Sequence, residues 1–167
     1  SIVLQNNVLF SGSVKDNLLW GNPTASVEEI ERVCKIACVD EFLNRLPGGL
    51  EYDLGQGGVN VSGGQKQRLC IARALLKQPK IIIFDDSTSA CDMETERRIL
   101  KGIRGLEGVT NIIIGQRITS VMEADQIIIL DNGRIVDIGT HEELMKRSMI
   151  YQELYKDQLG GVQECHQ

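Results

Sequence analysis

Two adjacent carboxylates and a glycine-rich helix start lie within one stretch of the sequence. Asp85 and Asp86 follow the apolar run Ile-Ile-Ile-Phe, and Gly63 and Gly64 lie upstream of it. Paired carboxylates attract Mg²⁺. The amino terminus of a helix has free N–H groups and the positive end of the helix dipole, and glycines let a phosphate approach these groups closely. The stretch therefore predicts a site that binds an anion and a cation together.

The segments that must position this site have the patterns of a helix and a strand. Ser62 and Gln65 stand in the Ser-x-x-Gln arrangement of a capping box, in which Ser62 accepts from the backbone N–H of Gln65 while Gln65 reaches back. The predicted helix is stopped by Pro79. Residues 81–84 are apolar on both faces, which suits a central parallel strand covered by helices on each side. In open α/β sheets, the carboxyl ends of such strands bind ligands.

Together, these two segments resemble a known family. Either segment alone could be a capped surface helix or a buried strand, but Ser-Gly-Gly-Gln-x-Gln-Arg followed by an apolar strand and two carboxylates is a specific combination. It resembles the signature motif and the Walker B strand of an ABC-type ATPase. The resemblance implies an α/β fold: a P-loop NTPase core of the ABC type, with a mainly parallel sheet flanked by helices and an inserted all-helical subdomain. It also implies ATP and Mg²⁺ as cofactors, with Asp85 as a Mg²⁺ ligand. The ATP-binding residues carried over from the family are Ser62, Gly63, Gly64 and Gln65.

Three further positions take roles from the same resemblance. Gln5 stands where the family has its Q-loop glutamine, which contacts the Mg²⁺ and water region; the segment after it lies against coupling helices of the membrane domain. On composition alone Gln5 could be an ordinary amide at a strand end. Asp92 resembles the D-loop aspartate that touches the partner subunit across the nucleotide interface, and it could equally cap the helix predicted from residue 93 to 104. Gln116 stands at the switch position.

The order of these motifs gives an expected organisation. A second and a third capping box begin at Ser26 and Thr140, and the Asn132-Gly133 pair between apolar runs predicts a β-hairpin. The helix that begins at Thr140 is expected to continue to about residue 158. The resemblance divides the chain, as one partial ABC ATPase domain, into a Q-loop strand and loop (1–14), a helical subdomain with the signature (15–78), a core with Walker B, D-loop and switch (79–159), and a disordered tail (160–167).

Length and composition narrow the class of protein. A chain of 167 residues suits one domain with a real core. The formal net charge of −5 argues against a nucleic-acid-binding module, which usually carries a basic stripe. No apolar stretch approaches the roughly 18 residues needed to cross a bilayer. An odd number of cysteines without metal-ligand spacing predicts reduced thiols rather than disulfides or zinc. They are Cys34, Cys38, Cys70, Cys91 and Cys165.

Several motif positions depart from the family pattern. Asp86 stands where the family places a glutamate that orients the attacking water, so its carboxylate is withdrawn by about 1.5 Å, roughly one carbon–carbon bond. Alternation along a strand would point Asp85 and Asp86 to opposite faces. Gln116 replaces the switch histidine, and an amide cannot carry the ring's charge or shuttle its proton. In the X-loop of exporters, Gln56 and Gly57 replace the usual glutamate and arginine.

The chain has weakened hydrolytic positions, Asp86 and Gln116, beside an intact signature. In this combination it resembles one subunit of a heterodimeric ABC exporter of the multidrug type. The expected partners are a second, non-identical nucleotide-binding domain and the transmembrane domain of the same transporter. In this interpretation Asp85 and Asp86 line a slow site, while residues 62–65 complete the competent site of the partner. A homodimer with two sluggish sites stays open as an alternative.

The phosphate-binding loop G-x-x-x-x-G-K-[ST] does not occur in the sequence, since no lysine is followed by Ser or Thr. By resemblance we expect the chain to be the carboxyl-terminal part of a nucleotide-binding domain, to bind ATP weakly and to hydrolyse none by itself. In the family's sheet order a missing strand would lie between the strands near Ile113 and Ile128. Two unpaired edges would follow, and these favour closure of the gap or a swapped or otherwise non-native oligomer.

Three functions compete for this sequence. The leading one is the ATPase of a membrane exporter, positioned at the cytoplasmic face of the cell membrane, with the isolated chain soluble. The second is a soluble ABC ATPase of DNA repair or translation, which would be expected to show coiled-coil insertions or basic linkers that this sequence lacks. The third is a non-catalytic interaction module. The transported substrate does not follow from these residues.

Overall fold

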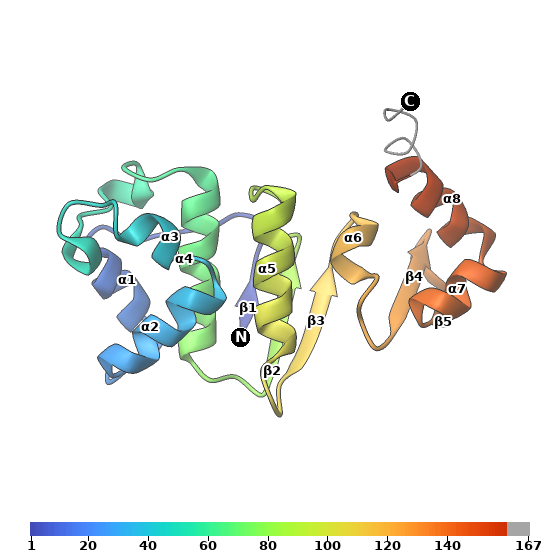
Figure 1. Cartoon of the computed structure of the whole chain (residues 1–167), viewed down its shortest axis with the longest axis horizontal. Helices are drawn as coiled ribbons and strands as arrows, with labels where there is room; N and C mark the ends of the chain where they lie inside the picture. The colour runs from blue at the N-terminus through green and yellow to red at the C-terminus, as the bar shows by residue number, and fades with distance from the viewer. Residues whose placement is uncertain (160–167) are drawn as a thin grey trace. The chain divides into compact units, whose positions relative to one another are not determined.

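The computed structural model describes residues 1–159, and the chain divides into two compact units, Ser1–Ile114 and Gly115–Gln167. The first unit combines a parallel sheet with a group of helices, and the second combines a β-hairpin with three helices (Figure 1). Each unit has its own hydrophobic core. Each is therefore described by itself.

The first unit carries its longest helix directly before its central strand. Between the first and second strands every named element is helical, as the sequence predicts. The helices are α1 (Val14–Leu19), α2 (Val27–Ile36), α3 (Asp40–Leu43), α4 (Gly63–Leu76) and α5 (Met93–Arg104), with short 3₁₀ turns η1 (Gly49–Glu51) and η2 (Gln56–Gly58). The strands are β1 (Ile2–Val3), β2 (Ile81–Asp85) and β3 (Thr110–Ile114).

These strands form a parallel sheet in the order β1-β2-β3. Ile83 pairs with Ile2 on one side of β2, and Asp85 pairs with Ile114 on the other. Because the strands are parallel, their carboxyl ends lie at the same end of the sheet, and Asp85 is the last residue of β2 at that end. The prediction that the carboxylates lie at the carboxyl end of this strand is confirmed.

Within residues 1–114, only one face of this sheet is covered. Ile82 and Phe84 are buried in a core that also contains residues of α4 and α5. On the opposite face Ile81, Ile112 and Ile114 are 53%, 44% and 53% exposed. The expectation that β2 is covered on both faces is wrong for this part of the chain, since an apolar run shows that side chains can be buried and not that a partner is there to cover them.

Local side-chain caps fix the helix starts as the sequence predicts. The capping boxes at Ser26, Ser62 and Thr140 are all present, with the side chain of each accepting from the N–H three residues on. A fourth, at Ser13, was not predicted because its reciprocal partner is the shorter Asp16. Each box satisfies N–H groups that the helix itself leaves free.

The second unit is built on an antiparallel hairpin. Its turn residues Asn132 and Gly133 both have positive φ, which confirms the predicted Asn-Gly turn. Ile127, Ile129 and Leu144 are buried together in the core of this unit. Its elements are α6 (Ile118–Val121), β4 (Ile127–Asp131), β5 (Arg134–Gly139), α7 (His141–Arg147) and α8 (Met149–Leu159).

The predicted continuous helix after Thr140 is wrong, because the chain leaves helical geometry at Ser148. Ser148 has φ −96° and ψ 107°, which ends α7, and its Oγ accepts from the backbone N–H of Tyr151 in the first turn of α8. Serine favours such a cap over the interior of a helix. No helix in residues 1–159 is long and apolar enough to cross a membrane. The predicted disordered tail, residues 160–167, lies outside the described residues.

Candidate functional site

The amino terminus of α4 opens onto a cleft of about 410 Å³. Ser62 and Gly63 are exposed there, and Gln65 closes the capping box behind them through a 2.8 Å bond from Ser62 N to its Oε1. The cleft combines the amino terminus of α4 with one cationic side chain, Arg68, and one anionic side chain, Asp92. Its polar lining comes from Ser62, Gly63, Gly64, Arg68, Asp92 and Thr95.

The loop after the carboxylates packs closely against this helix start. A Cβ placed on Gly64 would lie 2.9 Å from the carbonyl oxygen of Ala90, so only glycine permits this approach. Gln67, one turn into α4, is fully buried, and its Oε1 accepts from the backbone N of Ala90 at 3.0 Å and from Cys91 Sγ at 3.4 Å. The amide of Gln67 thus holds this loop, residues 87–92, which resembles the D-loop, against the signature helix α4.

Sequence reasoning gave Gln67 no role of its own. Its partner lies 23 residues away, so no local spacing rule finds the bond. The only signal was its place in Ser-Gly-Gly-Gln-x-Gln-Arg, on an otherwise apolar helix face. The Nε2 atom of Gln67 is buried and has no hydrogen-bond partner among the described residues.

The carboxyl end of the D-loop is held by two further bonds. Asp92 Oδ1 accepts from the backbone N of Thr95 at 2.9 Å and Oδ2 accepts from its hydroxyl at 2.7 Å. The predicted cap role of Asp92 is confirmed, and these bonds lower the pKa of its carboxyl. Buried Thr88 donates to buried Glu96 at 2.7 Å. Contact of Asp92 with a partner subunit stays a prediction.

Asp85 and Asp86 are positioned by different backbone geometries. Asp85 is the last residue of β2, whereas Asp86 has φ 44° and its N–H donates to the carbonyl of Ile114 at 2.8 Å. Strand alternation therefore does not extend to Asp86, because the chain turns through the left-handed region that aspartate tolerates. Gln5 Nε2 donates to Asp86 Oδ2 at 3.1 Å, so residues 81 positions apart meet at this edge.

The donor set of this edge fits Mg²⁺. Asp85 supplies carboxylate oxygens, and the amide of Gln5 gives its nitrogen to Asp86, which leaves the amide oxygen of Gln5 as the atom that can ligate a cation. Among residues 1–159 no group of three or more His, Cys, Asp or Glu residues could enclose a metal. Mg²⁺ commonly uses one or two carboxylates together with water and substrate phosphates, which suits this sparse set.

Gln116 lies in the second unit, in the exposed segment that follows β3. Its backbone carbonyl accepts from Nε2 of Gln158 at 2.8 Å. Oε1 of the same Gln158 accepts from the backbone N of Ile118, also at 2.8 Å. Sequence reasoning missed Gln158 because nothing in α8 marks one polar residue above the others.

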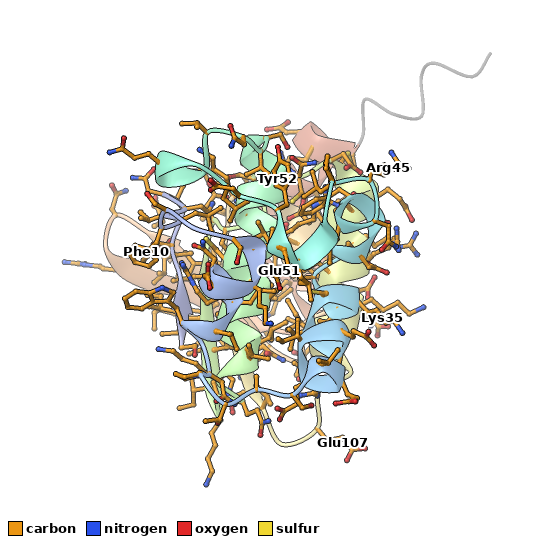
Figure 2. All side chains as sticks on the ribbon, turned by 90° about the vertical axis from the view of Figure 1, so that its left-hand side faces the viewer. Phe10, Lys35, Arg45, Glu51, Tyr52 and Glu107 are labelled. Carbon is orange, nitrogen blue, oxygen red and sulfur yellow. The ribbon has the colours of Figure 1, made fainter. Side chains whose placement is uncertain are left out.

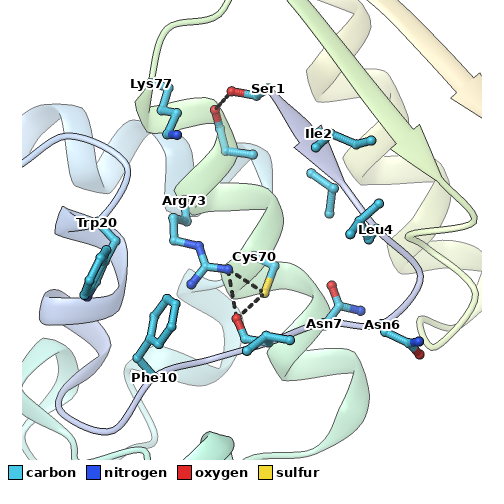
Figure 3. A pocket seen from close by; sticks show the side chains of 13 residues that line it. Ser1, Ile2, Leu4, Asn6, Asn7, Phe10, Trp20, Cys70, Arg73 and Lys77 are labelled. Atoms are coloured by element: carbon cyan, nitrogen blue, oxygen red, sulfur yellow. Dashed lines mark hydrogen bonds between the residues drawn. The ribbon is translucent and has the colours of Figure 1, made fainter.

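A second cleft, of about 460 Å³, lies beside the segment that follows Gln5. Phe10 and Trp20 stack on its wall with ring centroids 4.7 Å apart, and both are exposed (Figure 3). Arg73 on α4 donates to the carbonyl of Val8 at 2.8 Å, and its guanidinium lies 5.6 Å from the centre of the Phe10 ring. Figure 2 shows Phe10 at the edge of this unit away from Lys35.

The glycine loop before the signature packs behind this segment. Gly55, Gly57 and Gly58 have positive φ, a backbone conformation that glycine adopts without steric cost. A Cβ on Gly58 would lie 2.9 Å from Leu9 Cδ1. The segment 8–10 is thereby held between this loop and Arg73.

The cysteines within the described residues are free and buried: Cys34, Cys38, Cys70 and Cys91. Burial raises the pKa of Cys34 to about 12 and that of Cys91 to about 11. Both side chains therefore behave as small apolar groups in the core at neutral pH.

Comparisons with known proteins agree with one another. The family model described as ABC transporter matches residues 1–89. An uncharacterised ABC transporter ATP-binding protein of Bacillus subtilis is 46% identical over 98% of this chain and 29% of its own length. A Staphylococcus aureus protein, named among multidrug export ATP-binding/permease proteins, is 44% identical over 94% of this chain and 27% of its own length.

A solved structure is similar over nearly the whole chain. The structure of a bacterial Atm1-family ABC exporter with ATP bound is 38% identical with a TM-score of 0.90, over 95% of this chain and 28% of that one. The chain thus spans less than a third of the length of the relatives it matches.

Proposed function

The chain belongs to the ABC transporter family, and from that premise we propose that it works in the ATP-binding part of a membrane exporter, at the cytoplasmic face of the membrane. There it couples the binding and hydrolysis of ATP to efflux of a substrate. The relative named for multidrug export and the exporter with ATP bound support this proposal. The observation that carries it is the cleft at the amino terminus of α4, where two glycines, Arg68 and the D-loop residue Asp92 meet.

Residues 62–65 bind the nucleotide held by a second ABC subunit. The free N–H groups at the start of α4 attract phosphate oxygens, and the helix dipole adds to this attraction. Gly63 and Gly64 have no side chain that could keep a phosphate away from the backbone. Asp92, held by Thr95, presents the D-loop at the same cleft.

A second set of residues acts on the subunit's own nucleotide. When bound, Mg²⁺ neutralises charge on the phosphates. Asp85 and the amide oxygen of Gln5 would hold the Mg²⁺, and Asp86 would orient the attacking water. Gln116 donates a hydrogen bond to the γ-phosphate without moving a proton.

We assign this second set to a slow site. The carboxylate of Asp86 is one bond shorter than that of glutamate, and misplacement on the order of 1 Å can lower a rate about a hundredfold. The left-handed backbone conformation of Asp86 and its hydrogen bond from Gln5 keep the carboxylate in this position. The partner subunit is then non-identical and supplies the faster carboxylate at the site that residues 62–65 complete.

The stacked aromatic cleft is the proposed contact with the transmembrane domain of the same transporter. Phe10 and Trp20 expose large apolar surfaces, and Arg73 and Lys77 add positive charge at the same cleft. An amphipathic helix with an apolar face and an acceptor side chain suits this lining. Arg73 holds the carbonyl of Val8, in the segment that follows Gln5 along the chain, so this segment links the cleft to the proposed metal site.

Single-turnover hydrolysis by the assembled transporter tests the assignment of the two sets. Asp86→Asn should leave most of the fast hydrolysis intact, because it changes only the slow site. Gly64→Glu should abolish the fast hydrolysis, since a side chain there meets Ala90 at 2.9 Å and fills the phosphate-binding surface. Glu107→Gln, at an exposed position outside both sets of residues and outside the aromatic cleft, serves as the control for assembly.

The reverse ranking of the two variants would refute the assignment. The isolated chain should bind ATP weakly and hydrolyse none, because it contains no lysine followed by Ser or Thr of the kind found in phosphate-binding loops. ATP hydrolysis by the purified chain, abolished by Asp85→Asn, would contradict that expectation.

We also propose that the isolated chain associates with itself. The support is the apolar face of the β1-β2-β3 sheet, which leaves Ile81, Ile112 and Ile114 exposed beside the unpaired edge of β3. Light scattering should give a mass above that of one chain. A monomer with a high, cooperative melting temperature would contradict the proposal.

A further inference from the structure

The backbone of the switch segment, residues 116–118, is held by one side chain of α8. Gln158 in α8 accepts from the N–H of Ile118 and donates to the carbonyl of Gln116, each at 2.8 Å. The amide therefore bonds to both sides of Arg117, as a neighbouring strand would. Two bonds of good length from one planar amide fix the orientation of the peptide groups around Gln116.

The N–H of Ile118 would otherwise lack a cap. Ile118 begins α6, whose N-cap residue Arg117 makes no side-chain cap bond. The first N–H groups of a helix have no partner within the helix. Gln158 supplies one from 40 residues away.

Helix α8 has its own attachment to the second unit. Tyr151 is buried, its hydroxyl lies 2.9 Å from Nδ1 of His141, and Gln152 Nε2 donates to the carbonyl of Met145 at 2.8 Å. The helix is thus fixed on the core of this unit by its first two turns. Gln158 extends from the last turn to the switch segment, so its two bonds can be removed without removing the helix.

We propose that Gln158 is a positioning residue for Gln116, holding the switch segment so that the Gln116 side chain meets the γ-phosphate of the subunit's own ATP. This rests on the proposed function. Gln158 itself does not touch the nucleotide. Its effect is confined to ligands with a γ-phosphate, because that group is the one Gln116 meets.

Three variants separate positioning from simple capping of α6. Gln158→Leu removes both bonds. Gln158→Glu keeps an acceptor for Ile118 but replaces the donor to Gln116 with a carboxylate. Gln152→Leu is the matched control, because it removes an amide of the same helix whose bond goes to Met145.

Hydrogen exchange of the Ile118 amide in this chain tests the bonds directly. Gln158→Leu should speed exchange of that amide about tenfold, the effect of one lost hydrogen bond. Gln158→Glu and Gln152→Leu should leave it as slow as in the unmodified chain. Equal exchange in Gln158→Leu and the unmodified chain would overturn the proposal.

Release of labelled nucleotide from the slow site of the assembled transporter tests the positioning role. Gln158→Leu and Gln158→Glu should both release ATP about three- to tenfold faster, on the scale of one hydrogen bond, with release of ADP unchanged. A role confined to capping α6 predicts ATP release by Gln158→Glu at the unmodified rate, which would overturn the proposal. Absence of ATP retention in the unmodified transporter would instead refute the proposed slow site.

Discussion

The D-loop in the first unit and the switch segment in the second unit are held in opposite ways. Buried side chains hold the D-loop: the amide of Gln67 meets Ala90 and Cys91, and Thr88 meets Glu96. The switch segment is exposed at Gln116, and the amide that bonds it, Gln158, is exposed as well.

The signature and D-loop therefore form a preformed half-site, whereas the switch segment is adjustable. A buried hydrogen bond cannot be replaced by water, so breaking it costs about 1–3 kcal/mol, whereas water competes for an exposed one. The signature and D-loop therefore keep their geometry without a ligand. The amide of Gln158 that holds the switch segment is exposed, so changing the backbone there costs less than displacing the D-loop, which suits a residue that responds to a γ-phosphate.

The largest expected effect is on the reactivity of Cys91 in the D-loop. Its pKa of about 11 in the folded chain leaves a thiolate fraction on the order of 10⁻³ at pH 8. Alkylation should be a few hundredfold slower than in urea, as measured by mass spectrometry of the labelled peptide. Native labelling as fast as in urea would break the comparison.

The raised pKa of Cys91 also makes the stability of the folded chain depend on pH. The pKa of Cys91 in the folded chain lies above that of a free thiol. The contribution of this thiol to the free energy of unfolding is therefore complete below about pH 8.5 and is lost as the pH rises toward 11. Cys91→Ala should make the free energy of unfolding less dependent on pH in that range.

Removal of the Gln67 amide should come next in size. Gln67→Leu leaves the N–H of Ala90 without its partner and should lower the free energy of unfolding by about 1–2 kcal/mol. Urea unfolding followed by the fluorescence of Trp20, the single tryptophan, reports on the first unit.

Gln56→Leu is the control for this experiment, because Gln56 is exposed and surface changes stay within about 0.5 kcal/mol. The variant Gln67→Leu should also label faster at Cys91. Unfolding of both variants at the same urea concentration would show that the D-loop is not held by this amide.

The smallest effect on stability is expected for Gln5. Its bond to Asp86 is exposed, so Gln5→Leu should change the free energy of unfolding by less than about 0.5 kcal/mol. In the assembled transporter the same change should weaken the dependence on Mg²⁺ at the slow site. A large loss of stability would mean that Gln5 holds the fold and is not reserved for a ligand.

The sequence predicted the features that depend on neighbours along the chain. The boxes at Ser26, Ser62 and Thr140 need only a residue three positions on, and the Asn132-Gly133 turn needs only its own φ angles. The carboxylates at a strand end followed from one apolar run and the rule for ligand sites in α/β sheets.

The remaining features depend on contacts between distant residues. Gln67 meets a loop 23 positions away and Gln158 a segment 40 positions away, and neither pairing leaves a periodic trace. The left-handed turn at Asp86 and the break at Ser148 arise because local bonds compete with strand and helix continuation. An apolar strand could not reveal that one of its faces stays open.

The assignment of a slow site to Asp86 and Gln116 is the central claim, and restoring the longer base and the imidazole tests it most directly. In single-turnover hydrolysis by the assembled transporter, the double variant Asp86→Glu with Gln116→His should raise the fast phase from about one to about two ATP per pair of subunits, because single-turnover kinetics separate chemistry from binding. A fast phase that stays at about one, with both sites shown to bind ATP, would contradict the account.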